Sequence, residues 1–105
     1  MSLHPSASEH DHQRTFIRWA DTVLPRHESR LLWATPNGGH RHKRTAAKRK
    51  AEGVRAGVPD VFLAIPTRGY HGLFIEMKKP KGRTTEAQAQ YLAALAAVGY
   101  KAEVC

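Results

Sequence analysis

The chain has 105 residues, which is enough for one domain with a modest core and too few for two. Hydrophobic residues at 41% and charged residues at 25% exclude global disorder, and one cysteine excludes an internal disulfide framework or a multi-cysteine zinc site. Seventeen Lys and Arg against nine Asp and Glu give a formal net charge of +8, a field that attracts polyanions, with nucleic acid as the default partner.

A membrane surface is the rival partner for so basic a chain. However, no stretch approaches the ~18 apolar residues of a spanning helix, and the first residues lack a signal-peptide core. No glycine-rich phosphate loop is present either, so a nucleotide cofactor is not expected. We expect a soluble cytoplasmic protein with a single domain over residues 1–105, of which 1–7 are flexible.

The first half of the chain predicts a helix, a strand and a basic helical segment. Ser8 with Asp11 resembles a capping box that begins a helix over residues 8–24, and Pro25 ends it. The apolar run 31–34 predicts a short strand that enters a turn-rich loop at 36–39. Residues 41–55 hold seven Lys and Arg and one acid, with enough Ala, Lys and Arg to be helical.

The second half predicts a hairpin, a helix and a last strand. The runs 61–65 and 73–78 are rich in β-branched and large apolar residues and flank a loop that contains Pro and Gly. A second capping box opens an Ala- and Leu-rich helix at Thr85, Gly99 ends this helix, and a strand follows at 100–104. The fold class is therefore α/β, with a small mixed sheet flanked by helices. The helix residues expected in the core are Phe16, Trp19, Leu92 and Leu95.

The predicted hairpin brings three functional side chains to one corner. If it is symmetric about Gly69, facing residue numbers sum to 138, so Asp60 faces Lys78 and Val61 faces Met77. Glu76 and Lys78 share a face because side chains alternate along a strand, and Asp60 reaches them diagonally. Two adjacent carboxylates repel unless a cation joins them, and Mg²⁺ or Mn²⁺ would satisfy both and leave sites for water and a phosphate oxygen.

This cluster suits metal-assisted hydrolysis of a phosphodiester, with Lys78 orienting a water or stabilising charge on the phosphate. The competing interpretation is a strand whose solvent face carries Glu76 and Lys78, because the triplet Glu-x-Lys is common by chance. The context favours the functional interpretation. Gly57-Val58-Pro59-Asp60 begins one apolar strand, and Glu76-Met77-Lys78 ends the next in a basic chain.

These blocks, with Thr85-Glu86-Ala87-Gln88 and the end of the following helix at Gly99-Tyr100, resemble the virus-type replication-repair nuclease (VRR-NUC) family. That family belongs to the PD-(D/E)xK nucleases and implies a restriction-endonuclease-like core. The resemblance implies that Asp60 and Glu76 ligate the metal, that the Met77 backbone carbonyl is a further ligand, and that Lys78 is catalytic.

Two further site residues follow from the resemblance. Gln88 takes the place of the family's glutamine near the site, and Glu9 that of its acidic residue on the first helix, where it is a possible metal ligand. Each also has a structural explanation. Gln88 is the capping partner of Thr85, and Glu9 is a first-turn acid favoured by the helix dipole.

The basic segments are the expected contacts to the phosphate backbone, and few Asn or Gln accompany them, so recognition of shape is favoured over reading of bases. Zinc binding by His10 and His12 or by His40 and His42 is not favoured, because the first two point to different sides of a helix and the others lie among cations. The candidate nucleic-acid contacts are Asn37, Arg41, Lys43, Arg44, Lys48, Lys79, Lys81 and Arg83.

The resemblance implies a homodimeric DNA endonuclease that cuts four-way (Holliday) junctions, since small members of the family resemble such enzymes. A flap- or end-processing nuclease and a non-catalytic basic nucleic-acid-binding module remain as alternatives. Members usually continue into a further helical segment after the last strand, where this sequence stops, so the oligomeric state is open.

Overall fold

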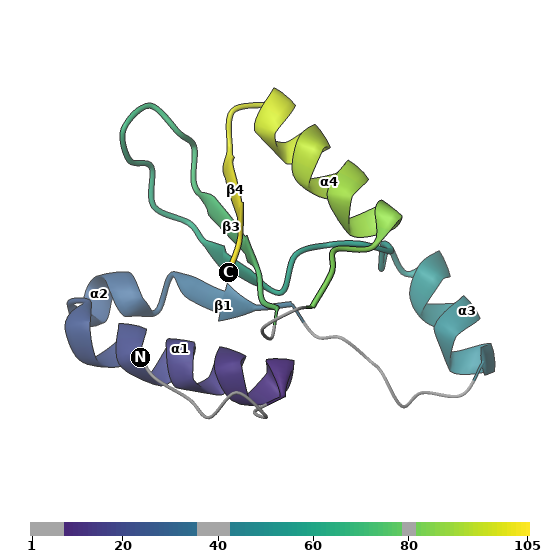
Figure 1. Ribbon diagram of the computed structural model, residues 1–105, viewed down its shortest axis with the longest axis horizontal. Coiled ribbons are helices and arrows are strands. Elements are labelled where there is room, and N and C mark those ends of the chain that lie inside the picture. The colour runs from purple at the N-terminus through teal and green to yellow at the C-terminus, as the bar shows by residue number, and fades with distance from the viewer. Residues whose placement is uncertain (1–7, 36–42, 79–81) are drawn as a thin grey trace.

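The computed structural model describes residues 8–35, 43–78 and 82–105, and the expected flexibility of residues 1–7 falls outside them. Helices and strands are interspersed along the chain, and the strands form one small sheet (Figure 1). In chain order the elements are α1 (Glu9–Val23), α2 (Arg26–Ser29), β1 (Leu32–Ala34), α3 (Lys43–Ala51), β2 (Val61–Leu63), β3 (Leu73–Glu76), α4 (Glu86–Ala97) and β4 (Lys101–Val104).

Both predicted capping boxes form. The Ser8 hydroxyl accepts from the Asp11 N–H at 3.1 Å, and the Asp11 carboxylate accepts from the Ser8 N–H at 3.2 Å. Thr85 and Gln88 exchange the same pair of bonds at 3.1 and 2.8 Å. Each box satisfies N–H groups that the first helical turn cannot pair, and this is why α1 and α4 begin where the sequence predicts.

The helix ends follow the local chemistry as well. Gly99 adopts a φ of 100°, and the Tyr100 N–H donates to the Leu95 carbonyl at 3.1 Å, the bond of a Schellman motif. Pro25 follows α1 and also begins the short helix α2, because its carbonyl accepts from the N–H groups of Glu28 and Ser29. The sequence did not predict α2.

The four strands form a mixed sheet in the order β1-β2-β3-β4. β1 pairs with β2 and β2 with β3 in antiparallel fashion, whereas β4 lies parallel to β3 and is reached through α4. The predicted α/β class with a small mixed sheet is therefore confirmed, and so is the basic helix, which spans Lys43–Ala51.

The predicted register of the hairpin is wrong by two. Val61 pairs with Ile75 and Leu63 with Leu73, so facing numbers sum to 136 instead of 138. A bridge pairs Thr67 with Tyr70 across a two-residue turn, and these two residue numbers sum to 137. Three residues separate Leu63 from Thr67, but only two separate Tyr70 from Leu73, so the register shifts by one more between the turn and the strands. Because both sums are even, every side chain keeps the face that was predicted for it.

One face of the sheet carries the core. Val61, Ile75 and Met77 are buried there, and Phe16 and Ile17 of α1 pack against them. The core predicted for the helices is wrong in one respect, because Trp19 is 48% exposed. Phe16, Leu92 and Leu95 are half-buried. Within the described residues, no helix has both the length and the apolar character needed to cross a membrane.

Candidate active site

The sheet places two carboxylates side by side at the end of the central strand pair. Asp60 directly precedes β2 and Glu76 is the last residue of β3, so extending the register Val61↔Ile75 by one position sets Asp60 opposite Glu76, and their side chains share a hydrogen bond. The corrected register therefore replaces a diagonal contact by a direct cross-strand pair, the closest relationship that two strands offer.

Backbone hydrogen bonds hold Asp60 from two sides. Its carboxylate accepts from the Met77 N–H at 2.8 Å, and its own carbonyl accepts from the Thr35 N–H at 2.7 Å. The first bond joins Asp60 to the strand that carries Glu76, and the second joins it to the residue that follows β1. Neither partner was identified from the sequence, because both come from pairing between segments far apart in the chain.

Cys105 holds the other side of the site through its backbone. Its N–H donates to the Glu76 carbonyl at 2.9 Å, and its carbonyl accepts from the Lys78 N–H at 2.7 Å. The parallel pairing of β4 with β3 thus continues beyond Val104 and fixes the segment from Glu76 to Lys78. The sequence predicts no role for Cys105, because these bonds come from its backbone and not from its thiol.

Glu76 is unusual for a charged residue because it is only 1% exposed. One of its oxygens, Oε1, is buried without a hydrogen-bond partner among the described residues. Burial is the main reason that the pKa of Glu76 is raised to about 8, and a hydrogen bond to Asp60 and the charge of Asp60 raise it further. Lys78 opposes this shift, and Glu9 adds to it. Without a cation, Glu76 therefore holds a proton at neutral pH.

These properties fit a hard divalent cation. A buried carboxylate oxygen that lacks a partner is costly, and a second carboxylate beside it offers another oxygen of the kind that Mg²⁺ prefers. Over residues 8–35, 43–78 and 82–105, no group of three or more His, Cys, Asp or Glu side chains could hold a metal ion. The chain would thus supply Asp60 and Glu76, and water and substrate would complete a magnesium shell.

Lys78 lies beside the carboxylates and is tied to α1. Its side chain is 11% exposed, and its Nζ lies 3.9 Å from Oε1 of Glu9. Glu9 also lies close enough to Glu76 to raise the pKa of that carboxyl. The first turn of α1 therefore brings a third acid to the site, where its described partner is the lysine.

Gly57 brings the start of α4 to the loop that leads to Asp60. It adopts a φ of 84°, and a Cβ at this position would lie 2.4 Å from the Ala87 carbonyl oxygen. Only glycine permits this approach. The contact places the turn that bears Gln88 against the segment 57–60, although the hydrogen bonds described for the Gln88 side chain are those of the capping box.

The structure describes only part of the predicted nucleic-acid contacts. Lys48 on α3 and Arg83 before α4 are exposed, as such contacts require. Lys43 and Arg44 begin α3, but their side chains are not described. The remaining four candidates lie outside the described residues: Asn37, Arg41, Lys79 and Lys81.

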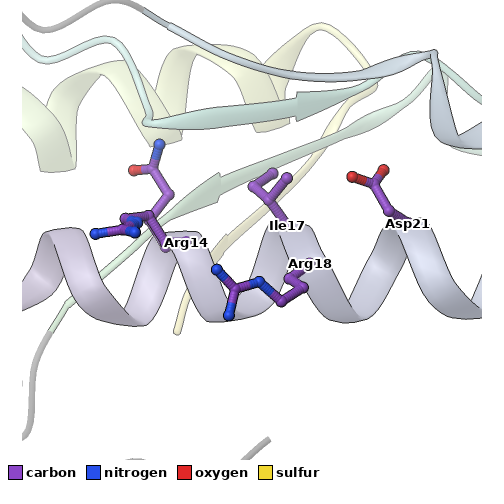
Figure 2. A pocket seen from close by; sticks show the side chains of 5 residues that line it. Arg14, Ile17, Arg18 and Asp21 are labelled. Carbon is purple, nitrogen blue, oxygen red and sulfur yellow. The ribbon is translucent and has the colours of Figure 1, made fainter.

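A hollow along α1 is lined by residues other than those of the Asp60–Glu76 site. Figure 2 shows Ile17 and Asp21 pointing from the helix toward the strands, with Arg14 and Arg18 on the near side. Gln13 completes the lining, and none of the lining residues is a carboxylate of the β2–β3 corner.

Comparison with known proteins gives a consistent result. The family model of the VRR-NUC domain matches residues 6–105. A solved structure described as a VRR_NUC domain protein is 30% identical in sequence, with a TM-score of 0.82, and the match covers 98% of this chain and 80% of the other. Among curated proteins, no match to the chain is found.

Proposed function

Because the chain belongs to the VRR-NUC domain family and is therefore a nuclease of the PD-(D/E)xK type, we propose that it is a divalent-metal-dependent endonuclease that hydrolyses DNA. The family resemblance inferred from the sequence is thereby confirmed, whereas the metal, the substrate structure and the roles of single residues belong to the proposal. A nuclease domain implies DNA as the substrate, and the net charge of +8 agrees with a polyanionic ligand.

One observation carries the proposal. Glu76 is buried opposite Asp60 with one oxygen lacking a partner and with its pKa raised to about 8. Burying a carboxyl oxygen without a hydrogen bond lowers the stability of the fold, and the described residues give this oxygen no partner. A purely structural role therefore does not explain Glu76. A bound Mg²⁺ or Mn²⁺ would replace the proton of Glu76 and satisfy both carboxylates.

The ligands we propose for the cation are Asp60, Glu76 and the Met77 backbone carbonyl. When bound, the cation supplies Lewis-acid charge to a phosphodiester and to its attacking water. The hydrogen bond from the Met77 N–H holds the Asp60 carboxylate in one orientation, and the Cys105 backbone holds the strand from Glu76 to Lys78. The chain therefore fixes both carboxylates before the substrate arrives.

Lys78 is the proposed catalytic base or charge stabiliser. Its Nζ lies close enough to Glu76 to oppose the rise in the pKa of that carboxyl, and from there it can donate to a phosphate oxygen or orient water. Glu9 would limit the movement of this long side chain through the ion pair at 3.9 Å. Gln88 is proposed to contact the substrate with its side-chain N–H groups, while its oxygen remains in the capping box.

For the substrate we propose a four-way DNA junction cut by a homodimer, in which two-fold symmetry would give paired incisions. This part rests on the family resemblance. A flap- or end-processing nuclease is the alternative, and it would cut a branched substrate with a free end in preference to a junction.

Labelled linear, flap and four-way-junction DNA, incubated with Mg²⁺, with Mn²⁺ or with chelator, tests the proposal. We expect cleavage that requires a cation and is lost in Asp60→Ala and Lys78→Ala, with DNA binding largely retained in Lys78→Ala. A non-catalytic binding module would instead bind DNA without a metal, with steep dependence on salt, and leave all three substrates intact.

A further inference from the structure

Aromatic rings form a row across the face of the sheet opposite the core. Trp33 on β1 pairs in register with Phe62 on β2, and Phe62 pairs with Phe74 on β3. The ring centroids of Trp33 and Phe62 are 4.9 Å apart at an angle of 77°, and those of Phe62 and Phe74 are 4.2 Å apart and stacked at 23°. Tyr100 continues the row beside Phe74 at 5.4 Å.

This row is the immediate neighbour of the carboxylate pair. Asp60 lies two residues before Phe62, and Glu76 lies two residues after Phe74, so all four side chains emerge on the same face. Two residues along a strand span about 7 Å. That is about two rises of 3.4 Å along one DNA strand.

Trp33 is the exposed end of the row. β1 is an edge strand, and Trp33 is 48% exposed, whereas Phe62 and Phe74 are half-buried. The contact with Phe62 is an edge contact, which leaves indole surface open to solvent. The sheet therefore presents an exposed aromatic side chain that packs against Phe62, one strand away from Asp60 and two strands away from Glu76.

We propose that Trp33 stacks on an unpaired nucleobase of the DNA whose phosphate lies at the Asp60–Glu76 pair, an inference that rests on the proposed nuclease function. Every base has a π face, so an exposed aromatic side chain binds unpaired strands without reading their sequence. A base inside an intact duplex is already stacked on its neighbours and is not available to Trp33. An aromatic side chain beside the carboxylates thus favours cleavage next to unpaired bases, as in a flap or fork, which is the alternative substrate named above and differs from a four-way junction with paired arms.

Tryptophan fluorescence tests this proposal without cleavage. The sequence holds two tryptophans, so Trp19→Phe leaves Trp33 as the one indole and Trp33→Phe leaves Trp19. Trp19 is the matched control because it is also 48% exposed and lies on α1, beside Phe16. Both proteins are titrated in chelator with a DNA fork bearing unpaired thymines and with a fully paired duplex of equal length.

We expect the fork to quench Trp33 emission at least two-fold, with less quenching by the duplex and little change for Trp19. Trp33→Leu should weaken binding of the fork about ten-fold and leave duplex binding unchanged, since stacking on one base contributes roughly 1–3 kcal/mol and 1.4 kcal/mol is a factor of ten. Trp19→Leu should leave both affinities unchanged, and circular dichroism checks the fold of each variant.

Equal quenching of Trp33 and Trp19, or equal quenching of Trp33 by fork and duplex, would overturn the stacking proposal. This result is distinguishable from failure of the nuclease proposal. Wild-type protein that cuts DNA with Mg²⁺ while Trp33 stays unquenched contradicts stacking alone. Quenching without any cleavage in Mg²⁺ or Mn²⁺ would contradict the nuclease function on which the inference rests.

Discussion

The carboxylate of Asp60 accepts a hydrogen bond of 2.8 Å from the backbone N–H of Met77, the residue between Glu76 and Lys78. This bond joins the two segments that carry the proposed active site, and it does so through the main chain. The Met77 side chain is buried in the core on the other face. The packing of the Met77 side chain in the core therefore also positions the backbone N–H that holds the Asp60 carboxylate.

Substitutions of Asp60 should separate its structural role from its chemical one. The amide in Asp60→Asn still accepts from the Met77 N–H, so stability at pH 7 should stay within about 1 kcal/mol of wild type, whereas Asp60→Ala should lose about 1–3 kcal/mol. Both should abolish cleavage, because neither replacement side chain carries the negative charge of the carboxylate. Chemical denaturation and cleavage assays check this, and equal destabilisation by the two variants would show that the hydrogen bond contributes nothing.

The stability of the metal-free protein should fall as pH rises from about 4.5 to 8. Burial raises the pKa of Glu76 to about 8 from an ordinary value of 4.5, so the folded state holds this proton more tightly than the unfolded state. The resulting stabilisation is complete below pH 4.5, decreases with rising pH, and is lost above 8.

The variant Glu76→Gln carries no ionisable group at this position and serves as the control. Its melting temperature in chelator, minus that of wild type, should increase from pH 5 to pH 8 and then level off. Parallel curves for the two proteins over this range would show that Glu76 is already ionised in the folded state.

Gly57→Ala should disturb the site through α4. A Cβ would lie 2.4 Å from the Ala87 carbonyl oxygen, and φ is 84°. Gly53→Ala is the matched control, because Gly53 has a φ of 100° and a Cβ added there would meet no atom within 4 Å. We expect Gly53→Ala to cost about 1 kcal/mol from backbone strain and Gly57→Ala to cost at least about 1 kcal/mol more, with a loss of cleavage. If both variants lower the free energy of unfolding equally, the close contact between Gly57 and α4 does not contribute to the effect.

Glu9→Gln should lower the cleavage rate by less than about ten-fold, because an ion pair that is partly open to solvent contributes up to about 1 kcal/mol. The reduction should appear in kcat more than in KM, since Glu9 acts on the position of Lys78. Glu103→Gln removes the same charge from the exposed pair with Lys101 and should leave cleavage unchanged. A loss beyond a thousand-fold in Glu9→Gln would instead indicate that Glu9 is a ligand or a catalytic group.

Local chemistry explains which parts of the fold were predictable. The helix starts at Ser8 and Thr85 and the helix end at Gly99 depend on residues within one turn, so the sequence alone identifies them. The faces of Glu76 and Lys78 were also predictable, because alternation along a strand needs no knowledge of the partner strand.

The errors and omissions come from contacts between distant segments. The register of β2 against β3 depends on how many residues lie between each strand and the turn. The amino-acid composition of the loop does not reveal this number. Two other contacts form only after the sheet has assembled. They are the approach of Gly57 to α4 and the hydrogen bonds of the Cys105 backbone to Glu76 and Lys78. Trp19 has the helical spacing of a core residue, yet it is 48% exposed, because α1 turns Ile17 and Ala20 toward the core and leaves Trp19 beside this buried side.

Calorimetric titration with Mn²⁺ at pH 7, in two buffers of different ionisation enthalpy, shows whether Asp60 and Glu76 together hold one divalent cation. Because the pKa of Glu76 is about 8, its carboxyl is mostly protonated at this pH and must release its proton to a metal. We predict one Mn²⁺ per chain, release of about one proton on binding, and no such binding in Glu76→Gln. Binding of Mn²⁺ without proton release, or with unchanged affinity in Glu76→Gln, would show that the Glu76 carboxylate is not a ligand of the cation.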